Sequence, residues 1–88
     1  MARIIENSGT SFKEAIIIQD AADHDDGVLA EYRYLERKFG VRGKDWDLVI
    51  QSLMQTDDNT HYDSVLIEFP DKTRKKIIFT IESFFDMG

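Results

Sequence analysis

Apolar and polar residues follow two different periods along this chain, and the change of period separates predicted strands from a predicted helix. Residues 12–19 contain three consecutive isoleucines, Ile16 to Ile18, which is typical of a strand buried on both faces. Residues 2–6 are a candidate partner for this strand, because the Asn, Ser, Gly and Thr of residues 7–10 suit a turn between them.

A helical period follows the polar segment 20–27. Its apolar residues fall at i, i+4, i+7 and i+11, which places them on one stripe of an amphipathic helix. We expect this stripe to pack on the sheet and Tyr34, on another side of the helix, to be more exposed. The members of the stripe are Val28, Tyr32, Leu35 and Phe39.

The two ends of the predicted helix carry matching signals. Asp25 and Asp26 supply capping and a favourable charge at its start. Arg37 and Lys38 lie in its last turn, where positive charge is favourable, and Gly40 is a natural residue to end it. The acidic residues at the start, the apolar stripe and the terminating glycine therefore all predict one helix.

Residues 46–56 fit both periods. Trp46, Val49, Ile50, Leu53 and Met54 fit one helical face, whereas Trp46, Leu48, Ile50 and Met54 alternate as in a strand that Ser52 interrupts. The turn-type sequence of residues 57–60 leads into another strand, and two runs of similar length around such a loop favour a hairpin. We predict a strand here.

The last third of the chain predicts a second hairpin, with strands at 62–69 and 73–85 around Pro70, Asp71 and Lys72. Val65, Ile67 and Phe69 share one face of the first strand, and Ile77, Phe79 and Ile81 share one face of the second. The sequence therefore predicts a single α+β domain over residues 1–88. Its element order is β-α-β-β-β, a small antiparallel meander with one main helix packed on one face.

Composition narrows the class of protein. With 88 residues, six Phe, three Tyr and one Trp, the chain is expected to fold as one globular domain. The formal net charge of −6 disfavours nucleic acid and anionic membranes as partners. The chain has no cysteine, and no apolar run reaches the length of a signal peptide or a membrane span, so we expect a cytoplasmic protein.

Chemical motifs are sparse, so we expect no catalytic residues, no metal and no cofactor. The acidic segment 20–26 fails as a calcium loop, because setting Gly27 as its glycine puts Ala22 and Arg33 at ligand positions. Gly40 and Gly43 are too close together for a phosphate loop. The two histidines are isolated, in an acidic loop and at a strand start, with no nucleophile motif near either one.

Basic residues form two clusters that are the candidate binding residues of this chain. If the second hairpin lies beside the end of the helix, the clusters form a positive patch for an acidic protein segment or a phosphorylated ligand. Otherwise they are ordinary surface charge. The first cluster is Arg33, Arg37, Lys38, Arg42 and Lys44, and the second is Lys72, Arg74, Lys75 and Lys76.

These features favour a small, non-catalytic protein-interaction or regulatory module. The alternative is an enzyme or a small-ligand-binding domain with a cleft between helix and sheet, using His24 or His61 as its titrating group. One helix covers only one face of the sheet, so Leu66 and Ile78 would lie uncovered on the other face, and a homodimer is expected to bury them. Residues 1–12 or the aromatic pair at 84–85 could cover that face instead.

Overall fold

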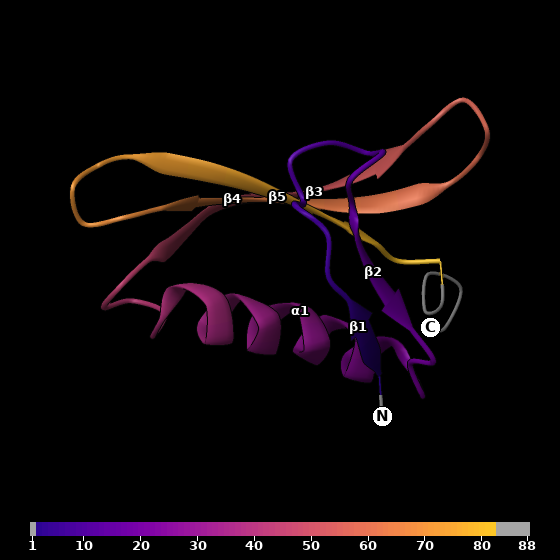
Figure 1. Ribbon diagram of the computed structural model, residues 1–88, viewed down its shortest axis with the longest axis horizontal. Helices are drawn as coiled ribbons and strands as arrows, with labels where there is room; N and C mark the ends of the chain where they lie inside the picture. The colour runs from indigo at the N-terminus through magenta and orange to yellow at the C-terminus, as the bar shows by residue number, and fades with distance from the viewer. Residues whose placement is uncertain (1, 83–88) are drawn as a thin grey trace.

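Within residues 2–82, which are those the computed structural model describes, five strands form one sheet and one helix lies across a face of it (Figure 1). This arrangement confirms the predicted α+β class, and residues 46–56 do contribute a strand. The elements are β1 (Arg3–Ile5), β2 (Ile16–Gln19), α1 (His24–Phe39), β3 (Asp47–Gln55), β4 (His61–Glu68) and β5 (Arg74–Thr80). The predicted end of the last strand, residues 83–85, lies outside the described residues.

The sheet is mixed, with the order β1-β2-β5-β4-β3. β3, β4 and β5 form the predicted antiparallel meander, but β2 pairs in parallel with β5 and β1 pairs antiparallel with β2. The prediction of a purely antiparallel meander is therefore wrong. Parallel neighbours need a long crossover, and here α1 and the strands β3 and β4 provide it, returning the chain so that β5 lies beside β2.

The core lies between α1 and the inner face of the sheet, the face toward the helix. Strict alternation along β4 and β5 places the predicted residues of both strands on this face. Trp46, just before β3, is also buried, and its indole Nε1 donates a hydrogen bond to the carbonyl oxygen of Gly40 at 2.9 Å. The most deeply buried apolar residues are Ile16, Ile18, Leu35, Trp46, Val65, Ile67, Ile77 and Phe79.

The ends of α1 follow local chemistry. Asp23, not Asp25 or Asp26, is the N-cap, and its carboxylate accepts a hydrogen bond from the backbone N–H of Asp26 at 2.8 Å. Asp25 and Asp26 lie in the first turn, where their charge is favourable. Gly40 ends the helix as predicted, with a φ of 105° that suits glycine.

The buried face of α1 is rotated from the predicted stripe. Val28, Tyr32 and Phe39 are half-buried at its flank, and the predicted exposure of Tyr34 is wrong because only 4% of this residue is exposed. β1 and β2 widen the sheet on that side, and the rings of Tyr34 and Phe79 pack in a T-shaped pair with centroids 5.8 Å apart. The buried face follows the i, i+3, i+4, i+7, i+8 pattern of Gly27, Ala30, Glu31, Tyr34 and Leu35.

The loop between β1 and β2 covers part of the outer face, on the side away from α1 (Figure 1). The rings of Phe12 and Tyr62 lie 4.8 Å apart, and the N–H of Ile78 donates to the carbonyl oxygen of Gly9 at 2.8 Å. Only 5% of Ile78 is exposed, and Leu66 is half-buried, so Ile78 needs no second subunit to cover it. The aromatic pair at 84–85 lies outside the described residues.

Among residues 2–82, α1 is too short and too polar to cross a membrane, and no other helix is present there that could do so.

Substitutions on α1 test the rotated face. Leu35→Ala should lower the free energy of unfolding by about 2–5 kcal/mol, and Tyr34→Ala by about 3–5 kcal/mol, because both side chains are buried. Leu29→Ala is the matched control on the same helix, where the side chain is exposed, and it should cost less than about 0.5 kcal/mol. Urea unfolding measures all three, and a Tyr34→Ala effect as small as the control would contradict this face.

Candidate functional site

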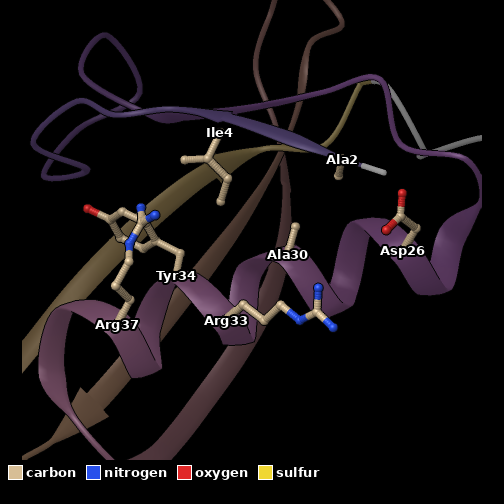
Figure 2. Close-up of a pocket in the computed structure, with 7 residues that line it drawn as sticks. All are labelled: Ala2, Ile4, Asp26, Ala30, Arg33, Tyr34 and Arg37. Atoms are coloured by element: carbon tan, nitrogen blue, oxygen red, sulfur yellow. The ribbon is translucent and has the colours of Figure 1, made fainter.

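The first group of predicted basic residues lies mostly along the β1 side of α1. Arg33 and Arg37 line a cavity of about 240 Å³ between α1 and β1, and Figure 2 shows their guanidinium groups pointing apart. Arg37 lies over the ring of Tyr34 at 5.7 Å, and Arg33 extends toward the turn that holds Asp26. Nearby, Lys38 Nζ contacts Glu6 Oε2 at 2.9 Å. The two arginines therefore do not converge on one anion.

The remaining basic residues lie around the β4–β5 turn and the end of α1. Lys72 and Arg74 both pair with Glu68, at 3.8 and 3.0 Å. Lys75 Nζ lies 5.7 Å from the ring centroid of Phe39, which brings the second cluster to the C-terminal end of α1. Arg42 lies over the ring of Tyr32 at 5.3 Å, and Lys44 and Lys76 are exposed. Most of these cations thus already contact a carboxylate or an aromatic ring of their own chain.

A second cavity, of about 280 Å³, lies between α1 and the β3–β4 half of the sheet, and we call it the acidic cleft. Glu31 enters it from the buried face of α1, and Asp63 enters it from the inner face of β4. The residues that line the acidic cleft are His24, Val28, Glu31, Gln51, Leu53, Asp63 and Ile81.

Glu31 and Asp63 are both buried, with 2% and 7% of each residue exposed. Asp63 Oδ2 accepts a hydrogen bond from Gln51 Nε2 at 2.5 Å, and Gln51 Oε1 accepts one from the hydroxyl of Tyr32 at 2.9 Å. Among the described residues, Glu31 Oε2 is buried without a hydrogen-bond partner. An unpaired carboxylate is costly in such a place, so burial favours the neutral, protonated form.

The protonation of Glu31 follows from these surroundings. Burial raises its pKa to about 10, with smaller contributions from its hydrogen bond to Asp63 and from the negative charge there. At neutral pH Glu31 therefore holds its proton beside Asp63. A protonated carboxyl group can exchange a proton with a ligand, but no Ser, Thr, Cys or Lys is among the described residues that line the acidic cleft.

The histidines lie in different places. His24 lines the acidic cleft, which is located between helix and sheet as the alternative prediction requires. His61 does not line it, and its Nδ1 lies 3.2 Å from Glu82 Oε1. Within residues 2–82, no three His, Asp or Glu side chains are grouped so that they could hold a metal ion.

Sequence reasoning missed Glu31 and Asp63, although both follow apolar patterns. Glu31 lies three residues after Val28 and four before Leu35, within the helical stripe. Asp63 lies two residues before Val65, so alternation places it on the inner face of β4. An acidic residue at a core-facing position is the signal that could have found the acidic cleft.

Beside the acidic cleft, β3 forms an apolar edge of the sheet. It is the last strand in the sheet order, and no strand among residues 2–82 pairs with its outer side. No charged residue occurs between positions 48 and 55, whereas the other edge strand, β1, has only three residues. Four large apolar side chains of β3 are exposed, with Ile50 at 57% and Leu53 at 61%: Val49, Ile50, Leu53 and Met54.

The fold and the site define a small α+β domain with an acidic cleft beside an apolar edge strand. Comparison with known proteins finds no matching family model, no matching curated protein and no matching solved structure.

The buried Glu31 predicts a specific dependence of stability on pH. Between the free carboxyl pKa of 4.5 and the raised value of about 10, the folded chain holds a proton that the unfolded chain releases. The unfolded state binds fewer protons, so the free energy of unfolding falls as pH rises, by at most about 1.4 kcal/mol per unit. The stabilising contribution is fully present below the lower pKa and is lost by the upper one.

Glu31→Gln keeps the shape and neutrality of the side chain, so it should remove this slope. The variant should gain stability relative to the natural chain on going from about pH 5 to about pH 8, as measured by urea unfolding. Glu36→Gln removes an exposed carboxylate from the same helix and is the control, which should leave the slope unchanged. Equal slopes for Glu31→Gln and the natural chain would show that Glu31 is not held protonated.

Proposed function

We propose that this chain is a non-catalytic protein-interaction module that binds an extended segment of a partner protein as an added strand along β3. The observation that carries the proposal is the outer edge of β3, with nine residues and four exposed large apolar side chains. An edge strand offers a row of backbone N–H and C=O groups to another strand, and the side chains beside it supply specificity.

The sequence of β3 lacks the usual protection of an edge. Folded proteins discourage strand addition with lysine, proline, β-bulges or very short edge strands. β1 follows this rule because it is short and carries Arg3. β3 is the longest strand of the sheet and has neither lysine nor proline, and its irregular pairing is confined to residues 48–50, so residues 50–55 form a regular edge. A regular edge left open over residues 50–55 is the feature expected of a strand-binding surface.

Charge favours a basic partner. Residues 45–71, which contain β3, its hairpin loop and β4, include seven acidic residues and no lysine or arginine. A segment rich in Lys or Arg complements this charge. A second copy of the chain would place two such acidic hairpins side by side, which makes the homodimer predicted from the sequence the less favoured occupant of β3. Nucleic acid is disfavoured by the same charge.

The predicted basic residues are a weaker binding surface than β3. Arg37, Arg42 and Lys75 lie over aromatic rings, and Lys38, Lys72 and Arg74 contact carboxylates. A ligand that used them would first have to replace these contacts, which lowers its net gain. Their role in receiving an acidic or phosphorylated ligand stays a prediction.

Selection from a library of short random peptides on the natural chain tests strand addition. Enriched peptides should carry alternating β-branched residues and should bind at least about tenfold more weakly to Ile50→Lys/Leu53→Lys, because the added charges oppose strand addition and repel a basic peptide. Both positions are exposed, so the fold should be retained. Leu29→Lys/Val41→Lys adds the same charges at exposed sites away from β3 and should change affinity by less than about twofold.

Two further measurements decide the occupant. A bound peptide should slow amide hydrogen exchange along β3, and the chain alone should sediment with the mass of one chain. A selection that yields no β3-dependent peptide would overturn the proposal. A dimer that Ile50→Lys/Leu53→Lys dissociates would also overturn it and would assign β3 to a second copy of the chain.

A further inference from the structure

We propose that the acidic cleft receives the ammonium or guanidinium group of a Lys or Arg side chain from the strand that pairs with β3. This inference rests on the proposed function and names the residue type that would make the partner specific. Four features of the cleft carry it: its hydrogen-bonding groups, its apolar walls, its position beside β3 and the proton on Glu31.

The acidic cleft offers hydrogen-bond acceptors, and among residues 2–82 neither Lys nor Arg supplies a positive charge there. The amide nitrogen of Gln51 donates to Asp63, and its oxygen already accepts from Tyr32. The buried Glu31 Oε2 has no hydrogen-bond partner among the described residues, and no Lys or Arg lines the cleft. A ligand that completes this arrangement must therefore donate hydrogen bonds, and a cation does so while offsetting the buried negative charge.

The walls and the size of the acidic cleft suit a side chain. Val28, Leu53 and Ile81 supply apolar surface around the two carboxyl groups. Lys and Arg bury an apolar stem while their charged end makes polar contacts. The volume of about 280 Å³ lies just below the range of ligand pockets, which is about 300 to 1,000 Å³. The cleft therefore fits a single side chain better than a large cofactor.

The position of the acidic cleft connects it to strand addition. Gln51 and Leu53 belong to β3 and line the cleft, and both pair with inner-face residues of β4. In a strand added to β3, every second side chain points to this same face. Directly opposed residues on paired strands have Cβ atoms about 5 Å apart. A Lys or Arg opposite Gln51 or Leu53 would thus begin beside the cleft and cover the exposed Leu53 with its stem.

Entry of the cation should replace the proton on Glu31. The titratable groups that face Glu31 in the cleft are Asp63 from β4 and His24 from the start of α1, whereas Gln51, Leu53 and Ile81 do not titrate. A cation beside the two carboxyl groups favours their charged forms and lowers the pKa of Glu31 from about 10. The proton passes to solvent, and the cation then faces two carboxylates.

The test uses a β3-dependent peptide, meaning a selected peptide that binds more weakly to Ile50→Lys/Leu53→Lys. A second version of this peptide has its Lys or Arg replaced by norleucine, which keeps the stem and removes the charge. The natural chain should bind the cationic peptide at least about tenfold more tightly than the norleucine version. Asp63→Asn and Glu31→Gln should each reduce this preference to less than about threefold, as a double-mutant cycle measures. Glu36→Gln removes an exposed carboxylate from α1, outside both the cleft and β3, and should preserve the preference.

Calorimetry in two buffers of different ionisation enthalpy should detect release of about one proton on binding near pH 7.5 by the natural chain and none by Glu31→Gln. β3-dependent peptides with equal affinity for both versions would overturn the cleft inference and leave strand addition standing. Absence of any β3-dependent peptide would overturn strand addition itself.

Free n-butylguanidinium, followed by NMR, separates a small ligand from a partner's side chain. The free cation should then shift the amide resonances of Gln51 and Leu53 in the natural chain but not in Asp63→Asn. If it does so while no selected peptide requires β3 for binding, the cleft binds a small cation, and the proposal of a partner's side chain is wrong. If Asp63→Asn does not fold, the norleucine comparison on the natural chain still decides the inference.

Discussion

Incomplete cover of the sheet by α1 is the constraint on which the other features depend. Sixteen residues make a helix about 24 Å long and about 10 Å wide, whereas β3 and β4, with nine and eight residues, extend for about 27–30 Å. α1 packs toward β1 and β2, so the inner face of the β3–β4 hairpin is covered only in part. The acidic cleft lies where helix and hairpin diverge, and the exposed Leu53 lies at its margin.

Local patterns predict the elements well and their partners poorly. The hairpin of β4 and β5 was predictable because Val65, Ile67 and Phe69 fall at every second position, as burial on one face requires, and a turn-type sequence follows them. The parallel pairing of β2 with β5 was not predictable, because a run of isoleucines indicates burial on both faces but does not indicate which strand lies beside it. The face of α1 was misplaced because a search for large apolar residues passes over Gly27 and Ala30, which are small but buried.

In the candidate site, too, the sequence shows which residues are present but not which residues they contact. Basic clusters stand out in a sequence, but their contacts with Glu6, Glu68 and aromatic rings depend on the fold. Glu31 and Asp63 look ordinary in an acidic chain, and they become informative only when each is seen to share a face with core residues. The helical and strand periods of the sequence show that each residue faces the core. That the two carboxyl groups lie close together follows only from the position of α1 over β4.

Two features that lower the stability or the solubility of a protein lie side by side in this fold. A buried acid that must stay protonated weakens the fold as pH rises, and an apolar residue of similar size would remove that cost. An unprotected edge strand carries a risk of unwanted pairing. Local rules are most often broken where a protein has a function to perform. Gln51 joins the two features, because it lies on the edge strand and its amide holds the carboxylate of the cleft. A ligand that paired with β3 and reached Glu31 would relieve both costs together.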